Sequence, residues 1–135
     1  PHTRNITLLS WGEKPMKLQI QSLRVGKLRV VITNSPSKYQ NIAGQLEFSN
    51  ESPINLVKRL ENQYKTMLLV GGGGLNTSFF KAGLVNELWL TLEPVVLGKG
   101  RMLIDEAGMG IKLTLFDTQK LNNQGTMLLK YKVAS

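Results

Sequence analysis

Four consecutive glycines constrain this chain more than any other feature of its sequence. They occupy positions 71–74, directly after Met67–Val70, an apolar run that predicts a short buried strand. An amphipathic run follows, and we expect a helix there from about Asn76 to Ala82. The first backbone N–H groups of a helix have no partner inside it, and the helix dipole places partial positive charge there. Because glycine lets an anion approach such N–H groups closely, this glycine turn is a candidate anion site.

The glycine turn has a second interpretation, a tight turn that simply packs closely. It is not a Walker loop, because no Gly-Lys-Ser/Thr follows it, and it lacks the third glycine of a GxGxxG pattern. Our working hypothesis is that the turn holds the phosphates of a nucleotide cofactor. The close-packing interpretation stays open beside it.

Composition excludes several function classes. The chain has 135 residues and no cysteine, so it has no disulfide and no thiolate metal site. A single histidine excludes a histidine-based zinc site and a Ser-His-Asp triad. No stretch is apolar for long enough to cross a bilayer, so we expect a cytoplasmic protein that contacts no membrane.

The formal net charge of +8 raises the question of nucleic-acid binding. The lysines and arginines are spread through the chain, and no stripe of aromatic residues alternates with them. We therefore expect no nucleic-acid partner and interpret the charge as a solvated basic surface. A field that attracts an anionic cofactor or a phosphorylated substrate is the other interpretation.

A second candidate site follows the β-branched run Lys27–Thr33, which predicts a strand. The polar segment Asn34–Lys38 ends this strand, and ligands dock at the carboxyl ends of strands in open α/β sheets. An ordinary Asx or Ser turn would have the same composition. On the residues alone we favour the ordinary turn.

The first predicted helix begins at Ser52 and Pro53, because serine caps a helix and proline fits its first position. Its buried face is expected to carry four residues at helical spacing, namely Ile54, Val57, Leu60 and Tyr64. Its charged residues, Lys58, Arg59 and Glu61 among them, are expected to be solvated.

The remaining pattern predicts the fold class. Phe79, Phe80 and Leu84 are expected to face a sheet, and Gly83 to end the second helix. Further strands are predicted at 6–9, 46–48, 85–93, 111–116 and 126–133, with a loop at 94–100 and a hairpin turn at 122–125. The prediction is an α/β fold with a mixed, mostly parallel sheet, flanking helices and a C-terminal antiparallel hairpin.

Three motifs together resemble a known family. Val70-Gly71-Gly72-Gly73, the segment 82–88 with the pattern AGLV-x-EL, and the loop Pro94–Gly100 with the pattern P-V-x-L-G-x-G are similar to the C-terminal reductase domain of the bifunctional riboflavin-biosynthesis deaminase/reductase. The resemblance runs from about Lys27 to the C-terminus. It implies a dihydrofolate reductase-like fold, NADPH as cofactor and a homodimer.

The resemblance also implies roles for the two candidate sites. The glycine turn and the residues after it would cradle the cofactor pyrophosphate: Gly71, Gly72, Gly73, Gly74, Leu75 and Asn76. The polar end of the earlier strand would bind the adenosine 2′-phosphate through Thr33, Asn34 and Ser35, with Lys38 nearby. No catalytic residue can be assigned. Glu93 is the one carboxylate worth testing as a general acid, and a structural role is favoured for it.

The expected function is therefore an NADPH-dependent reductase that transfers a hydride to a pyrimidine ribosyl-phosphate intermediate of riboflavin biosynthesis or to a related pterin-like substrate. The alternative is a non-catalytic nucleotide-binding or assembly module of the same fold. Val70 stands where the family usually has glutamate, and the strand that opens the family domain is not found in this sequence. We accordingly expect residues 1–135 to form a single reductase-like domain that is incomplete.

Overall fold

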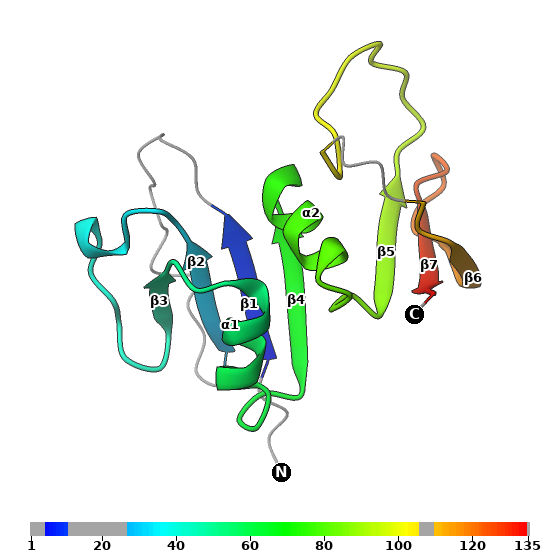
Figure 1. Ribbon diagram of the computed structural model, residues 1–135. Helices are drawn as coiled ribbons and strands as arrows, with labels where there is room; N and C mark the ends of the chain where they lie inside the picture. The colour runs from blue at the N-terminus through cyan, green and yellow to red at the C-terminus, as the bar shows by residue number, and fades with distance from the viewer. Residues whose placement is uncertain (1–4, 11–26, 106–109, 135) are drawn as a thin grey trace.

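The computed structural model describes residues 5–10, 27–105 and 110–134, with backbone only for 5–10 (Figure 1). In these ranges lie seven strands, two α-helices and a short 3-10 helix. In chain order they are β1 (Asn5–Ser10), β2 (Lys27–Ile32), η2 (Pro36–Lys38), β3 (Leu46–Ser49), α1 (Pro53–Leu60), β4 (Thr66–Gly71), α2 (Gly73–Lys81), β5 (Glu87–Leu92), β6 (Leu113–Lys120) and β7 (Met127–Val133).

The first four strands form a parallel sheet in the order β3-β2-β1-β4. Parallel strands need crossover connections, and α1 supplies the one that carries the chain from β3 across the sheet to β4. Figure 1 shows α1 and α2 side by side in front of this sheet. Residues from both helices join one core cluster, so both helices cover the same face.

The core lies between the two helices and this sheet. Its fully buried members come from three elements: Leu28 and Val30 of β2, Leu56 and Leu60 of α1, and Leu75 and Phe79 of α2. The predicted face of α1 was partly wrong. Ile54 is 47% exposed, whereas Leu56, which the helical spacing did not select, is completely buried. Phe80 is only half-buried, while Phe79 is buried as expected.

The helix boundaries follow the expected capping chemistry. The Ser52 hydroxyl accepts the backbone N–H of Asn55 at 3.3 Å, with Pro53 at the first helical position. Gly83 follows α2 with a φ of +69°, a conformation that glycine adopts without strain. The start of α2 is a correction: the helix begins at Gly73 and not at Asn76, so two glycines lie within its first turn.

The last three strands form a separate antiparallel sheet in the order β5-β7-β6. The predicted terminal hairpin is confirmed, although β6 runs further along the chain than expected. The Asn122 side-chain oxygen accepts three successive backbone N–H groups, from Gln124, Gly125 and Thr126, each at 3.1 Å. The α/β class is confirmed, but the strands of the described ranges form two sheets and not one mixed sheet. Within those ranges β4 pairs only with β1 and β5 only with β7.

Candidate functional site

Both candidate turns lie at one edge of the parallel sheet. Because β2 and β4 are parallel, their carboxyl ends point the same way, and Val31 and Gly71 both have Leu9 of β1 as register partner. The chain therefore leaves β2 at Thr33 and β4 at Gly72 at the same level. One strand separates the two turns, which at the usual strand spacing places them about 10 Å apart.

The glycine turn delivers the chain directly into α2. Gly71 has a φ of +112°, and its peptide bond to Gly72 is cis. Gly72 caps the helix, and its carbonyl accepts the Asn76 N–H at 2.9 Å. In the ranges that the structure covers, no acceptor is found for the N–H groups of Gly73, Gly74 and Leu75. These are the groups that would meet an anion.

Residues 102–105, which we call the strap, lie across the first turn of α2. The Asn76 side-chain amide donates to the Leu103 carbonyl at 2.8 Å. The Asp105 N–H donates to the Thr77 hydroxyl at 2.8 Å, and this hydroxyl donates to the Gly73 carbonyl at 2.7 Å. Asn76 and Thr77 are each 8% exposed, so the strap covers both polar side chains while satisfying them.

The strap explains why position 73 carries glycine. A Cβ at Gly73 would lie 2.7 Å from Asp105 Oδ1 and 2.9 Å from the Met102 carbonyl oxygen. A Cβ at Gly74 would lie 3.4 Å from Asp105 Oδ2. The close-packing interpretation therefore holds at Gly73 whether or not the turn binds an anion. The sequence did not reveal this contact, because nothing in the glycine run points to a partner about thirty residues later.

Asn76 is placed differently from the other residues of this candidate site. Its backbone N–H and its side-chain amide both donate to carbonyls of the protein itself. Of the N–H groups at the start of α2, those of Gly73, Gly74 and Leu75 have no hydrogen-bond acceptor in the described ranges. Leu75 is itself 7% exposed because its side chain belongs to the core.

The polar turn after β2 has the geometry of an ordinary serine–threonine turn. The Thr33 hydroxyl accepts the Ser35 N–H at 3.3 Å, and the Ser35 carbonyl accepts the Lys38 N–H at 3.2 Å. Asn34 and Lys38 are exposed. These two hydrogen bonds stabilise the turn from within. The turn also exposes the Asn34 amide and the Lys38 ammonium group to solvent, at the same edge of the sheet as the glycine turn.

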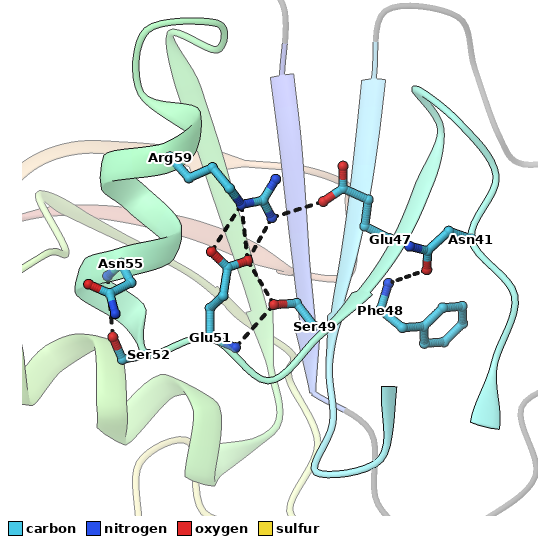
Figure 2. A network of polar contacts seen from close by, with 8 residues as sticks. All are labelled: Asn41, Glu47, Phe48, Ser49, Glu51, Ser52, Asn55 and Arg59. Atoms are coloured by element: carbon cyan, nitrogen blue, oxygen red, sulfur yellow. Dashed lines mark hydrogen bonds and ion pairs between the residues drawn. The ribbon is translucent and has the colours of Figure 1, made fainter. Parts of the chain in front are cut away.

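An ion-pair network lies beside this turn at the end of β3 (Figure 2). Arg59 of α1 donates to both carboxylate oxygens of Glu51, with its Nη2 2.7 Å from Oε1, and to Glu47 at 2.9 Å. The Ser49 hydroxyl also donates to Glu51 at 2.8 Å. Arg59 is exposed, as expected, but it is also ion-paired: its partners lie eight and twelve residues earlier, outside the reach of helical spacing.

The ion-pair network changes the electrostatics of the sheet edge at which the two candidate turns lie. The hydrogen bonds that Arg59 donates lower the pKa of Glu51, against a smaller opposing effect of burial. The same bonds to Glu51 and Glu47 raise the pKa of Arg59. Two carboxylates thus neutralise one guanidinium, which is not available to a ligand phosphate. A phosphate at the adjacent turn would depend on other cations, of which Lys38 is the nearest in sequence.

Glu93 belongs to the second sheet. Its carboxylate accepts the Thr126 hydroxyl at 2.9 Å, and the Asn122 amide donates to that hydroxyl at 2.8 Å. Glu93 therefore ties the end of β5 to the hairpin turn, in agreement with the structural role favoured for it. Across the described ranges no group of carboxylate, histidine or cysteine residues is suited to hold a metal ion. None of the helices found there is long and apolar enough to span a membrane.

Parallel strands that end together in a glycine turn and a polar turn define an α/β protein with a candidate ligand site at the carboxyl ends of its strands. The chain belongs to the RibD C-terminal domain family, whose profile matches residues 15–127. Its expected relation to the riboflavin reductase domains is thereby confirmed at the level of the family.

Two proteins of Bacillus subtilis (strain 168), both uncharacterized, are related to the chain in sequence. YyaP is 36% identical over 89 residues, which cover 64% of this chain and 47% of YyaP. YwjB is 33% identical over 91 residues, which cover 67% of this chain and 51% of YwjB. The alignments thus span about half the length of these curated relatives.

The fold is also found in a solved structure from Thermotoga maritima, a diaminohydroxyphosphoribosylaminopyrimidine deaminase/5-amino-6-(5-phosphoribosylamino)uracil reductase. The superposition has a TM-score of 0.67 and covers 98% of this chain and 46% of that chain, at 11% sequence identity. At this identity the likeness establishes a shared fold and does not establish a shared substrate.

Proposed function

We propose that the chain carries the reductase activity of an NADPH-dependent enzyme that acts on a pyrimidine ribosyl phosphate of riboflavin biosynthesis or on a related pterin-like substrate. The observation that most supports this function is that the glycine turn after β4 and the polar turn after β2 lie at the same level on one edge of the parallel sheet. Their separation of about 10 Å, two strand spacings, suits a dinucleotide whose pyrophosphate and 2′-phosphate occupy different turns. Family membership supports the same assignment and a dihydrofolate reductase-like arrangement.

In this proposal the glycine turn holds the pyrophosphate through the free N–H groups of Gly73, Gly74 and Leu75. The turn at Thr33, Asn34 and Ser35 holds the 2′-phosphate. The bound nicotinamide supplies the hydride, and the protein orients cofactor and substrate and excludes water. The homodimer implied by the family resemblance and a cytoplasmic location are parts of the same proposal.

Titration of NADPH, followed by nicotinamide fluorescence, tests the cofactor site. Gly74→Asp is the informative variant, because Gly74 is exposed and its new carboxylate would stand where the phosphate must lie. We expect it to weaken NADPH binding at least tenfold, about 1.4 kcal/mol. Gly110→Asp adds the same charge where a Cβ would meet no other heavy atom of the described part of the chain within 4 Å, and it is the control. Equal affinities for the two variants, or no binding by the natural chain, would refute the assignment.

The second candidate is a non-catalytic nucleotide-binding or assembly module of the same fold. It is favoured because Glu93, the carboxylate considered as a general acid, lies in the hairpin network and not at the two turns. The two candidates differ in turnover. Oxidation of NADPH in the presence of 5-amino-6-(5-phosphoribosylamino)uracil supports the reductase, whereas tight NADPH binding without oxidation supports the module.

A further inference from the structure

The carboxylate of Asp105 lies against the glycine turn. Its two oxygens are the atoms that a Cβ at Gly73 or Gly74 would meet, at 2.7 and 3.4 Å. The side chain is exposed, and within the described ranges it pairs with no lysine or arginine. A negative charge with no cationic partner among the described residues therefore stands beside the N–H groups that the proposed function assigns to the pyrophosphate.

The strap holds the backbone that carries this charge against α2. Two hydrogen bonds hold its backbone to α2, from the Asn76 amide to the Leu103 carbonyl and from the Asp105 N–H to the Thr77 hydroxyl. The donor and acceptor side chains are both buried, which limits their freedom to rearrange. The carboxylate itself accepts no N–H group of the first turn within the described ranges, so it does not act as a hydrogen-bonding cap.

We propose that Asp105 sets the affinity of the glycine turn for phosphate by holding a like charge at its entrance. This inference rests on the proposed function, because it needs a phosphate at that turn. The carboxylate offsets part of the helix dipole and repels each phosphate charge that enters. It acts only on groups near the turn, so the 2′-phosphate, about two strand spacings away, is little affected.

The test compares two variants that remove one carboxylate each. Asp105→Asn keeps the size of the side chain and removes its charge from the entrance. Asp117→Asn removes the same charge on β6, in the other sheet, where Asp117 pairs with Lys130 at 3.5 Å. We expect Asp105→Asn to lower the Kd for NADPH about fivefold, equivalent to about 1 kcal/mol, and Asp117→Asn to leave it unchanged.

NADH provides a further control, because it has the same pyrophosphate and lacks the 2′-phosphate. Asp105→Asn should lower the Kd for NADH and the Kd for NADPH by the same factor. This gain in affinity should shrink in 1 M salt, where the Debye length is about 3 Å. An unchanged or higher Kd for both cofactors in Asp105→Asn would overturn the inference. A gain confined to NADPH would also overturn it, since the charge would then act on the other turn.

The stability of the ligand-free protein gives a readout that needs no cofactor. A carboxylate near the start of α2 stabilises the helix, so Asp105→Asn should lower the melting temperature while Asp117→Asn serves as its reference. The measurements distinguish failure of the proposed function from failure of the inference about Asp105. If the natural chain and both variants bind no NADPH, the proposed function is refuted and the inference falls with it. If the natural chain binds NADPH and Asp105→Asn does not tighten it, only the inference is refuted.

Discussion

Replacing Gly73 by alanine would put a methyl group into space that the strap already fills. Its Cβ would lie 2.7 Å from Asp105 Oδ1 and 2.9 Å from the Met102 carbonyl oxygen. The Asp105 side chain is exposed and can rotate away. The Met102 oxygen belongs to the backbone, so the strap itself has to move.

The expected cost follows from what this movement disturbs. Overpacking of this kind costs about 1–3 kcal/mol. A displaced strap also weakens two hydrogen bonds to Asn76 and Thr77, each worth about 1 kcal/mol. Alanine also raises the free energy of unfolding by about 0.4–1 kcal/mol, because it restricts the conformations of the unfolded chain. We expect Gly73→Ala to lower the free energy of unfolding by about 1–3 kcal/mol.

Urea denaturation followed by far-ultraviolet circular dichroism measures this loss, and Gly74→Ala is the matched control. Among the described residues, a Cβ at Gly74 meets only Asp105 Oδ2, at 3.4 Å, and we expect that variant to be no less stable than the natural chain. Adding Asp105→Ala to Gly73→Ala should restore only part of the loss, because the Met102 carbonyl stays in place. Equal stability of the two alanine variants would refute the reasoning, and full recovery in the double variant would show that the strap backbone is no obstacle.

Two further predictions concern α1. Arg59→Ala should lower stability by about 1 kcal/mol near neutral pH. Because Arg59 lowers the pKa of Glu51, this contribution is present above the ordinary carboxyl pKa and is lost as the pH falls through the folded value. The difference in stability from the natural chain, measured by urea denaturation, should thus shrink as the pH falls below the ordinary carboxyl pKa, and a constant difference would contradict the prediction. Leu56→Ala should cost about 2–5 kcal/mol because Leu56 is fully buried, and Ile54→Ala less than about 1 kcal/mol; comparable losses would contradict the assigned face of α1.

Local chemistry made the ends of the helices and the terminal hairpin predictable. Ser52 and Pro53 start α1, and Gly83 follows α2, because capping and positive φ depend on neighbouring atoms only. The hairpin turn is likewise encoded by adjacent residues around Asn122. The β-branched run at 27–32 forms a strand for similar reasons.

Contacts between distant segments were not predictable in the same way. The buried face of α1 is chosen by how the helix lies on the sheet, and this favours Leu56 over Ile54. Arg59 finds its partners on β3 and in the following loop, and Asp105 reaches the glycine turn from a loop beyond β5. The sequence therefore located both candidate turns, but it did not disclose the charges that stand next to them.

Among the strands that the structure describes, β4 and β5 each leave one edge unpaired, and these edges bear on how the chain behaves in concentrated solution. Such an edge presents backbone N–H and C=O groups that readily pair with a strand of a neighbouring molecule. On β4, Leu68 and Val70 are 58% and 54% exposed, and they add apolar surface next to this strand edge. Aggregation of the isolated chain should begin along these strands, and lysine at either position would raise the concentration at which the protein stays monodisperse.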